Sequence, residues 1–474
     1  MEKLFKLKQN NTTVRIEMLA GLTTFMTMAY IIALNPNLLT NFGAEGSDIW
    51  NGVFLATCIA SAVGSIVMAF LANKPFVMAP GMGLNSFFAA VVANIAAMTG
   101  MTYVASFQSA LVIIFIEGII FLLLSIFNVR EKIVEAIPLG VRLGIGPSIG
   151  LMLMNIGFGS NVGIYSESGG PFYAMRDFFG SLTASFAKTQ MGSGYAPMVL
   201  TVITMFVGMF LIVALDHKKV KGAVLFGMLG AAVVYWIGEA LFLHTNPFAS
   251  LAGASFVPPF RDMAATTLFK LDFSGIVQIG WFTLITLIIT FCIIDMFDTI
   301  GTLVGTAARA KMLDKNGNMP QMKEALFSDA VGTLTGSLTG TSTVTTFVES
   351  ASGVAAGGRT GLTALTAAIL FLLSMFLAPV AAIIPPAATS SALIYVGILM
   401  LGNLNQVDFT DVSQMLPVSV MLLAMPVSGS IGHGIGLALI CYTLIKVCTG
   451  KAREVSVLTY ILSVIFLIKF FAAV

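Results

Sequence analysis

Two carboxylates lie inside one long apolar run of the sequence. The run begins near Ile276 and continues to about Val304, and its only charged residues are Asp295 and Asp298. Side chains three residues apart share a face of a helix, so both acids would point the same way. A charged side chain at bilayer depth costs roughly 2.5–3.5 kcal/mol on insertion scales, so it normally faces a partner or a polar cavity. The pair therefore predicts a polar site inside a membrane protein.

Two more polar residues lie in segments that are poorly suited to ordinary spanning helices. Asn85 belongs to residues 74–92, where proline and glycine crowd the first half, and Glu349 belongs to the Gly/Ser/Thr-rich residues 336–358. We expect each segment to be an extended piece that runs into a short helix. Non-helical backbone at membrane depth is tolerated only where it lines a cavity or is buried in protein. Both segments are therefore expected to lie at the site.

These side chains match one kind of ligand. Carboxylates accept hydrogen bonds from ring N–H groups, and an asparagine amide offers both a donor and an acceptor. Asn85, Asp295, Asp298 and Glu349 together would suit a small, flat, uncharged heterocycle. A buried carboxylate beside another acid can also carry a proton during each cycle.

Each of these residues also has a structural interpretation. Asp298 could bind only the backbone of a neighbouring helix, and Asn85 could cap the short helix that it begins. Asp295 and Glu349 could be purely structural as well. Glu117, an isolated acid in the apolar segment 106–127, is expected to hydrogen-bond a neighbouring helix and to support proton coupling rather than to touch a ligand.

Composition defines the class of protein. Of 474 residues, 57% are hydrophobic and only 10% are charged, which is too little charge for a soluble surface. The net charge of +2 comes from basic residues spread over connecting segments, so no nucleic-acid partner is expected. No Gly-x₄-Gly-Lys-Ser/Thr loop of an ATP-driven pump occurs, and no cofactor is expected. The lipid bilayer is the expected surrounding.

Apolar segments long enough to cross a membrane recur along the whole chain, and we count about fourteen. They lie near residues 17–39, 50–72, 76–97, 106–127, 133–157, 197–215, 221–243, 276–305, 325–339, 343–357, 360–379, 384–402, 414–428 and 430–447. An extra apolar segment, 454–474, follows them and could cross, re-enter or lie on the membrane surface. Lys3, Lys6, Lys8 and Arg15 precede the first span, which places the N-terminus in the cytoplasm by the positive-inside rule.

The two irregular segments are the third and the tenth span, seven apart. Interrupted segments at matching positions in two halves indicate an inverted-repeat transporter with its site between them. A second echo supports this: IPLGVRLGIGPSIG (137–150) and IPPAATSSALIYVG (384–397) share an Ile-Pro start and a terminal glycine. We therefore predict one transporter domain, 1–474, with inverted repeats at 14–245 and 270–450.

Three motifs carry a family resemblance. APGMGLNSFF (79–88), IDMFDTIGT (294–302) and GTSTVTTFVESASGVAAGGRTG (340–361) resemble the signatures of the azaguanine-permease-like purine permeases, a branch of the nucleobase–cation symporters. The resemblance extends over essentially the whole chain. It implies an all-α polytopic fold like that of the uracil permease, with fourteen spans as seven-plus-seven inverted repeats. It also implies core and gate domains and short strands in spans 3 and 10.

The resemblance further implies proton-coupled import of guanine, hypoxanthine or adenine across the cytoplasmic membrane. Carried over to this sequence, it makes Asp295 and Glu349 substrate-binding acids, Asn85 the amide of span 3, and Asp298 a second acid of span 8. We expect backbone amides near Gly83 and Val348 to contribute to binding. We assign Asp298, Glu349 and Glu117 to proton coupling and its support.

Some alternatives stay open at this point. Another nucleobase, xanthine or uracil, is a candidate substrate, although related carriers of those bases use Glu with a nearby His on span 8, which this chain lacks. An intramembrane aspartate-dependent enzyme is the rival from another class, but the chain lacks the Tyr-Asp and Gly-x-Gly-Asp motifs of membrane aspartyl proteases. We therefore expect a transporter rather than an enzyme. The sequence does not choose between H⁺ and Na⁺ as the coupling ion, among the purines, or between a monomer and a homodimer.

Overall fold

The chain folds into two compact units, each assembled from separated stretches of sequence. The structure is a computed structural model and describes residues 2–41, 44–127, 137–159, 195–309, 312, 319–428 and 430–472. Unit 1 comprises Met1–Pro138, Phe256–Ala378 and Arg453–Val474, and unit 2 comprises Leu139–Ser255 and Pro379–Ala452. Both halves of the sequence thus contribute to each unit.

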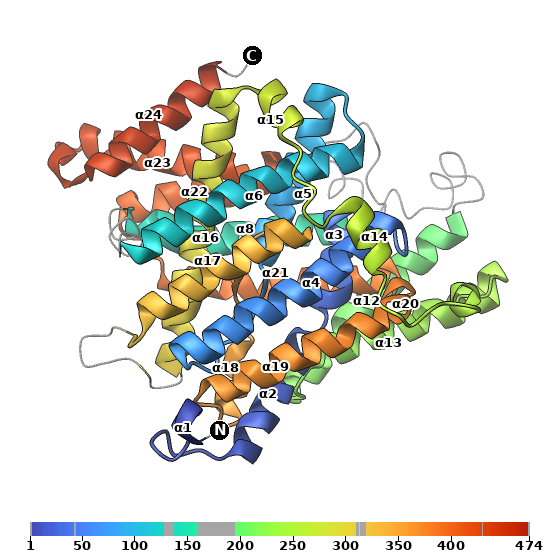
Figure 1. Cartoon of the computed structure of the whole chain (residues 1–474). Coiled ribbons are helices and arrows are strands. Elements are labelled where there is room, and N and C mark those ends of the chain that lie inside the picture. Colours follow the sequence, from blue (N-terminus) through green and yellow to red (C-terminus); the bar gives the residue numbers. More distant parts are fainter. Residues whose placement is uncertain are drawn as a thin grey trace. The chain divides into compact units, whose positions relative to one another are not determined.

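Unit 1 contains long helices that pack alongside one another, among them α4 and α6 on either side of α17 (Figure 1). Its principal elements are α2 (Val14–Met28), α3 (Ile31–Leu39), α4 (Asp48–Val67), β1 (Met78–Pro80), α5 (Met82–Thr99), α6 (Tyr103–Ile126), α14 (Phe260–Thr266), α15 (Phe273–Ile279), α16 (Trp281–Arg309), α17 (Met322–Thr339), β2 (Val344–Thr346), α18 (Ser350–Ala355), α19 (Gly361–Ser374) and α24 (Val457–Ala472). Hydroxyl side chains begin several of these helices. Thr13, Ser47 and Thr102, for example, accept from backbone N–H groups in the first turns of α2, α4 and α6.

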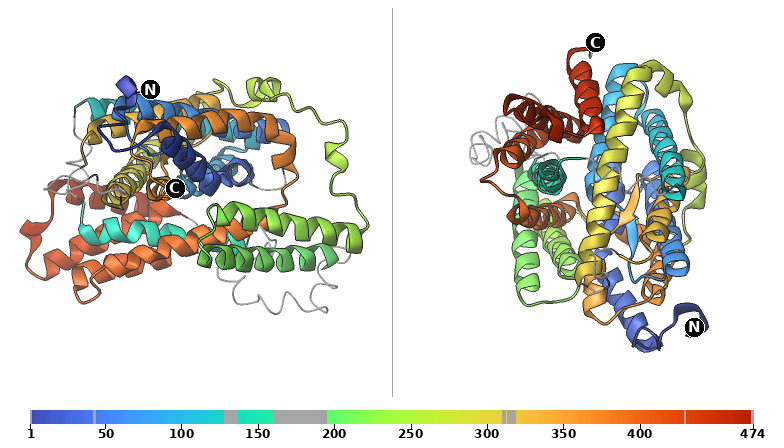
Figure 2. Two further views of the ribbon diagram at one scale, coloured as in Figure 1. Left: turned by 90° about the horizontal axis from the view of Figure 1, so that it is seen from below. Right: turned by 90° about the vertical axis from the view of Figure 1, so that its left-hand side faces the viewer.

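Two short strands interrupt the helices of unit 1. β1 pairs with β2 in antiparallel orientation, with Ala79 opposite Thr345 at the centre of the ladder. The strands lie side by side among the helices of this unit (Figure 2, right, blue and orange arrows). The prediction of short strands in spans 3 and 10 is therefore confirmed.

A helix follows each strand, as the sequence predicted. Gly81, between β1 and α5, donates its N–H to Thr343 O at 3.1 Å. At the other end of the ladder, Phe347, between β2 and α18, donates its N–H to Val77 O at 3.0 Å. Because the strands are antiparallel, α5 and α18 begin at opposite ends of the ladder.

In the part of unit 2 that the structure describes, the regular elements are all helices. Its principal elements are α8 (Leu139–Phe158), α12 (Tyr195–His217), α13 (Ala223–Gly238), α21 (Pro386–Leu401), α22 (Val412–Ser428) and α23 (Ile431–Cys448). The helices α8 and α21 approach closely at two glycines. A Cβ on Gly150 would come within 2.5 Å of Gly397 O, and a Cβ on Gly397 would come within 2.5 Å of Gly150 O. These are the terminal glycines of the two similar stretches found in the sequence.

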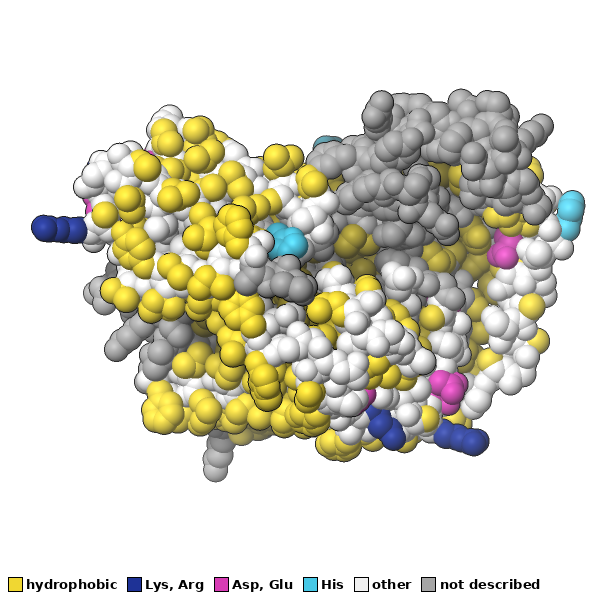
Figure 3. Space-filling view, turned by 90° about the horizontal axis from the view of Figure 1, so that it is seen from above, with side chains coloured by type: hydrophobic (Ala, Val, Ile, Leu, Met, Phe, Trp, Pro, Cys, Tyr) yellow, Lys and Arg dark blue, Asp and Glu magenta, His cyan; other side chains and the backbone are white. Residues whose placement is uncertain are grey.

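Eleven helices among the described residues are long and apolar enough to cross a membrane. They match all the predicted spans except those near 325–339, 343–357 and 414–428, where the structure has α17, the β2–α18 segment and α22. Hydrophobic side chains also cover much of the face shown in Figure 3, with few charged ones among them. A helical, polytopic membrane protein is thus confirmed, and the count of fourteen spans stays a prediction.

Some predicted segments differ in extent from the helices of the structure. The span that carries Asp295 and Asp298 was expected from Ile276 onward, but α16 begins at Trp281 because Gly280 adopts a positive φ of 83° and separates it from α15. Residues 133–136 of the predicted fifth span lie outside the described residues. Within the predicted extra segment 454–474, the structure has α24.

Candidate functional site

Glu349 lies in the turn between β2 and α18 and is held by a buried tyrosine. The Tyr30 hydroxyl, at the junction of α2 and α3, donates to Glu349 Oε1 at 2.7 Å. Tyr30 is fully buried, whereas the Glu349 side chain is partly exposed. The carboxylate is thus fixed by a protein donor and is still accessible to a ligand.

Asn85 lies in the first turn of α5 and is fully buried. Its Nδ2 donates to Pro80 O at 3.3 Å, and its Oδ1 accepts a hydrogen bond from the Ser342 hydroxyl. The amide therefore joins the start of α5 to the turn that precedes β2. Asn85 does not cap α5, the structural role that the sequence left open, because the N-cap of α5 is Gly81. Its contacts instead bring it to the paired strands β1 and β2 and the residues next to them, which we call the strand crossing.

Asp295 and Asp298 lie on α16 and differ in exposure. Asp298 is partly exposed, and its Oδ2 accepts from the Thr345 hydroxyl of β2 at 3.4 Å. Asp295 is fully buried, and its Oδ1 accepts from the Thr299 hydroxyl at 3.1 Å. The structure thus brings Asp298 to the strand crossing and encloses Asp295.

Asp329, on α17, belongs to the same cluster. It is fully buried, and the Thr299 hydroxyl lies 2.7 Å from its Oδ1. Thr299 therefore bridges Asp295 and Asp329. A hydroxyl has only one hydrogen to donate, so a proton on one of the two carboxyl groups would let Thr299 donate to one acid and accept from the other. The bridge is a natural place to hold a proton.

Glu117 reaches the cluster from α6. It is fully buried, and its Oε2 accepts from the Thr343 hydroxyl at 3.0 Å. Thr343 directly precedes β2, and its carbonyl oxygen accepts from Gly81. The prediction was a hydrogen bond between Glu117 and a neighbouring helix, but the partner in the structure is Thr343, in the non-helical residues that precede β2.

Gly83 and Val348 flank the crossing. Gly83 lies in the first turn of α5, where backbone N–H groups are not used by the helix itself. The Val348 side chain is 59% exposed, although it lies between the buried Phe347 and the partly exposed Glu349. The accessible side of the cluster is therefore formed at residues 348 and 349 and at Asp298.

Electrostatics join the acids into one group. Asp298 lies close enough to interact with Asp329 and with Glu349. With the Thr299 bridge, this places Asp295, Asp298, Asp329 and Glu349 in a single network of carboxyl groups. Within the described part of the chain, no three His, Cys, Asp or Glu side chains are arranged to hold a metal ion.

Sequence reasoning missed three members of this network. Asp329 lies in a segment that was counted as an ordinary span, and its single carboxylate there was the signal that could have revealed it. Tyr30 lies in an apolar stretch in which an aromatic residue is indistinguishable from a lipid-facing one. Thr299 follows Asp298 directly, but only the fold shows that its hydroxyl reaches a second helix.

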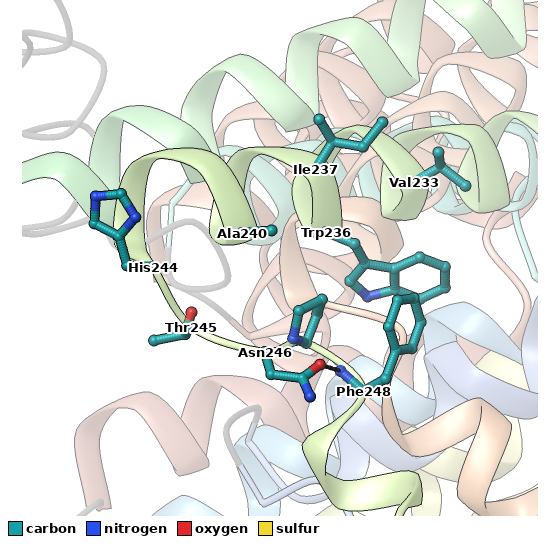
Figure 4. A pocket seen from close by; sticks show the side chains of 9 residues that line it. Val233, Trp236, Ile237, Ala240, His244, Thr245, Asn246 and Phe248 are labelled. Carbon is teal, nitrogen blue, oxygen red and sulfur yellow. Dashed lines mark hydrogen bonds between the residues drawn. The ribbon is translucent and has the colours of Figure 1, made fainter.

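A surface cavity of about 780 Å³ lies elsewhere, in unit 2. Trp236 and Phe248 lie side by side in it, and His244 and Asn246 border it (Figure 4). No predicted site residue lines this cavity, which is formed by α13 and the residues that follow it as far as Phe248. The carboxyl network of unit 1 is therefore the candidate site.

Comparison with known proteins gives the family. A model described as the Permease family matches residues 15–431. The chain is 36% identical over 470 residues to the adenine permease AdeP of Escherichia coli (strain K12), a match that covers 99% of this chain and 95% of that protein. It is 35% identical over 475 residues to the guanine/hypoxanthine permease PbuO of Bacillus subtilis (strain 168), covering 99% and 100%.

A solved structure supports the fold. The transmembrane domain of the cyanobacterium bicarbonate transporter BicA superposes with a TM-score of 0.63 at 14% sequence identity, covering 89% of this chain and 97% of that one. At this identity the likeness concerns the fold alone. The match of the family model and the near full-length relatives carry the assignment: the chain belongs to this permease family and is a membrane transporter rather than an enzyme.

Proposed function

We propose that this protein is a secondary transporter that imports purine nucleobases across the cytoplasmic membrane together with protons. Guanine and hypoxanthine are the preferred candidates, and adenine is the third. The relatives named as adenine and guanine/hypoxanthine permeases support the substrate class. The multi-pass helical fold supports a site within the membrane.

The observation that carries this proposal is the carboxyl network at the strand crossing. Glu349 and Asp298 present partly exposed carboxylates beside the exposed residue 348. A purine offers ring N–H donors that such acceptors bind, and its own ring nitrogens and carbonyl oxygens accept from backbone N–H groups. The amides near Gly83 and Val348 are our candidates for those donors.

The two acids of α16 have different proposed roles. The family resemblance assigns ligand contact to Asp295 and support or proton handling to Asp298. The exposures favour the reverse for the conformation described, because Asp298 is accessible and Asp295 is enclosed. We therefore assign contact with the purine to Glu349 and Asp298.

Proton coupling is assigned to the enclosed part of the network. We place the coupled proton on one of the two carboxyl groups that the Thr299 hydroxyl bridges, Asp295 or Asp329. Release of that proton changes the charge beside Asp298, which interacts with Asp329. Glu117 supports the network from α6 through Thr343. The coupling ion is then H⁺ rather than Na⁺.

Inverted repeats at 14–245 and 270–450 remain our proposal for the architecture. Pairs of elements seven spans apart meet in each unit: β1 with β2 in unit 1, and Gly150 with Gly397 in unit 2. Unit 1 would be the core domain and unit 2 the gate domain.

We also propose that the N-terminus lies in the cytoplasm, because basic residues precede α2. A homodimer is the oligomeric state to test.

Uptake of labelled purines tests the function. Cells without their own purine carriers are supplied with the protein, and uptake of labelled hypoxanthine is competed by adenine, guanine, xanthine and uracil. We expect saturable uptake that purines compete for and that a protonophore abolishes in Na⁺-free buffer. Absence of purine uptake, with the protein shown to be in the membrane, would refute the proposal. Uptake that requires Na⁺ would refute the coupling alone.

A further inference from the structure

One face of α2 contacts the segment that carries Glu349 at every turn. Its residues are Glu17, Ala20, Thr24 and Thr27 of α2, spaced three or four apart as one face of a helix requires, and Tyr30, which lies two residues beyond the end of α2 and precedes α3. We refer to them as the α2 stripe. All the contacts of the α2 stripe described below are with residues 349–363, which contain α18 and the turn before α19.

The first end of the α2 stripe is anchored by a buried acid. Glu17 is fully buried, and its Oε1 accepts from Arg359 N at 2.9 Å. Its Oε2 accepts from Thr360 N at 3.2 Å and from the Thr363 hydroxyl at 2.5 Å. The acid thereby satisfies backbone donors at the start of α19, and it fixes the end of the segment that is farther from Glu349.

The middle of the α2 stripe makes close contacts with α18. A Cβ on Gly353 would come within 2.0 Å of Thr24 Oγ1 and 2.9 Å of Ala20 O, so only glycine allows this approach. The hydroxyls of Thr27 and Ser352 are 2.9 Å apart. These contacts fix the position of α18 along α2.

The last member of the α2 stripe reaches the site. The fully buried Tyr30 donates to Glu349 Oε1 at 2.7 Å. α18 has only six residues, and a helix of that length does not hold its own shape in isolation. Ser350, the first residue of α18, is also hydrogen-bonded to Val77, so the place of Glu349 depends both on the residues before β1 and on the α2 stripe. Of these contacts, the Tyr30 hydroxyl is the one that binds its carboxylate.

We infer that the α2 stripe positions Glu349 for the ligand and that the Tyr30 hydroxyl is its decisive contact. Tyr30 is then a positioning residue for substrate affinity that acts through Glu349. This inference rests on the proposed function, since it takes Glu349 as a ligand for the purine. The contacts themselves are independent of what is transported.

The test is the substitution Tyr30→Phe, which removes one hydroxyl and keeps the ring. Tyr103→Phe is the matched control, because the Tyr103 hydroxyl donates to a backbone oxygen, Leu39 O, at 2.6 Å within the same unit. We expect Tyr30→Phe to raise the KM for the transported purine about ten-fold, as loss of a hydrogen bond to a charged group does, while the maximal rate changes little. Tyr103→Phe should leave the KM unchanged.

A second measurement separates this inference from the proposed function. The melting temperatures of the purified protein, Tyr30→Phe, Glu349→Ala and the double variant form a cycle that requires no ligand. We expect the two substitutions to be non-additive, because each removes the same hydrogen bond. Additive effects, or a KM change no larger than that of Tyr103→Phe, would overturn the inference. Non-additivity in a protein that takes up no purine would uphold the positioning contact and refute the proposed function instead.

Discussion

Each unit contains a tyrosine that donates to a carboxylate, in very different settings. In unit 1 Tyr30 donates to Glu349 at 2.7 Å, and in unit 2 Tyr395 donates to Asp216 at 2.7 Å. Glu349 interacts with Asp298 at the strand crossing, whereas Asp216 is exposed near the end of α12, next to His217 and Lys218. The hydrogen bond alone therefore does not define a functional site, and the groups around the carboxylate decide whether it is one.

The interiors of the units differ in the same way. Among the described residues, unit 1 buries acids and amides, namely Glu17, Asn35, Asn37, Asn85, Glu117, Asp295 and Asp329. The buried polar residues described in unit 2 are all hydroxyls: Ser148, Thr204, Thr389, Ser390 and Ser391. Buried charge is costly unless it is paired or used, so its concentration in unit 1 indicates function there. Unit 2 is built instead from close helix contacts.

The largest expected effect contrasts the two carboxylates. Glu349→Gln should reduce the uptake efficiency for the purine about 100-fold, the cost of losing charge-assisted hydrogen bonds to the ligand. Asp216→Asn, its matched control in unit 2, should change uptake by less than about two-fold, as expected for an exposed group. The measurement is initial uptake at several substrate concentrations. An equal loss of uptake efficiency in both variants would contradict the assignment of substrate binding to unit 1.

Within unit 1, substitutions of the two acids of α16 are expected to have different effects on uptake. Asp298→Asn should raise the KM about ten-fold, because Asp298 is the accessible acid. Asp295→Asn should instead lower the maximal rate and reduce accumulation driven by a pH gradient, because it disturbs the Thr299 bridge. Uptake kinetics with and without a pH gradient separate the two. The opposite result would support the division of roles that the family resemblance implies.

Much of the site could be predicted from the sequence, and the reasons are particular. Asp295 and Asp298 are conspicuous as the only charges in an apolar run, and the proline and glycine before Asn85 indicate broken helices. Both signals are local. They predicted an extended piece before Asn85, and the Gly/Ser/Thr-rich residues around Glu349 predicted a second one. The family resemblance implied that both pieces are short strands, and the structure has β1 and β2 there.

The remaining features depend on contacts between distant segments. Tyr30 and Glu349 are more than three hundred residues apart, with |i−j| of 319, so no local pattern links them. The exposure of Asp298 and the enclosure of Asp295 likewise depend on how α16 packs. In the sequence, both are aspartates of one apolar run and are expected on the same helix face. The composition of the two units also requires tertiary pairing, because each combines stretches from both halves of the chain.

A third prediction concerns how unit 2 is held together. Gly150→Ala should destabilise the protein by about 1–3 kcal/mol, the usual cost of overpacking, because the added Cβ would meet Gly397 O at 2.5 Å. Gly402→Ala is the matched control, because nothing lies within 4 Å of its Cβ position. Thermal unfolding of the purified variants measures the difference. A melting temperature that is equally unchanged in both would contradict the close contact of α8 and α21.

The smallest expected effect is at β2. Thr345→Val removes the hydroxyl that donates to Asp298 at 3.4 Å, a long hydrogen bond. We expect the KM to rise by about two-fold to three-fold, with the maximal rate unchanged. Competition by unlabelled purine gives this value. A change as large as that of Asp298→Asn would mean that Thr345 itself contacts the ligand.

The acids of unit 1 are proposed to bind a purine and to couple its entry to protons. Purified protein in proteoliposomes, with a pH gradient imposed across the membrane and labelled hypoxanthine outside, tests this directly. We predict accumulation above the external concentration by the unsubstituted protein, collapse of that accumulation with a protonophore, and none in Glu349→Gln. Accumulation that is unaffected by the protonophore, or that persists in Glu349→Gln, would contradict the account.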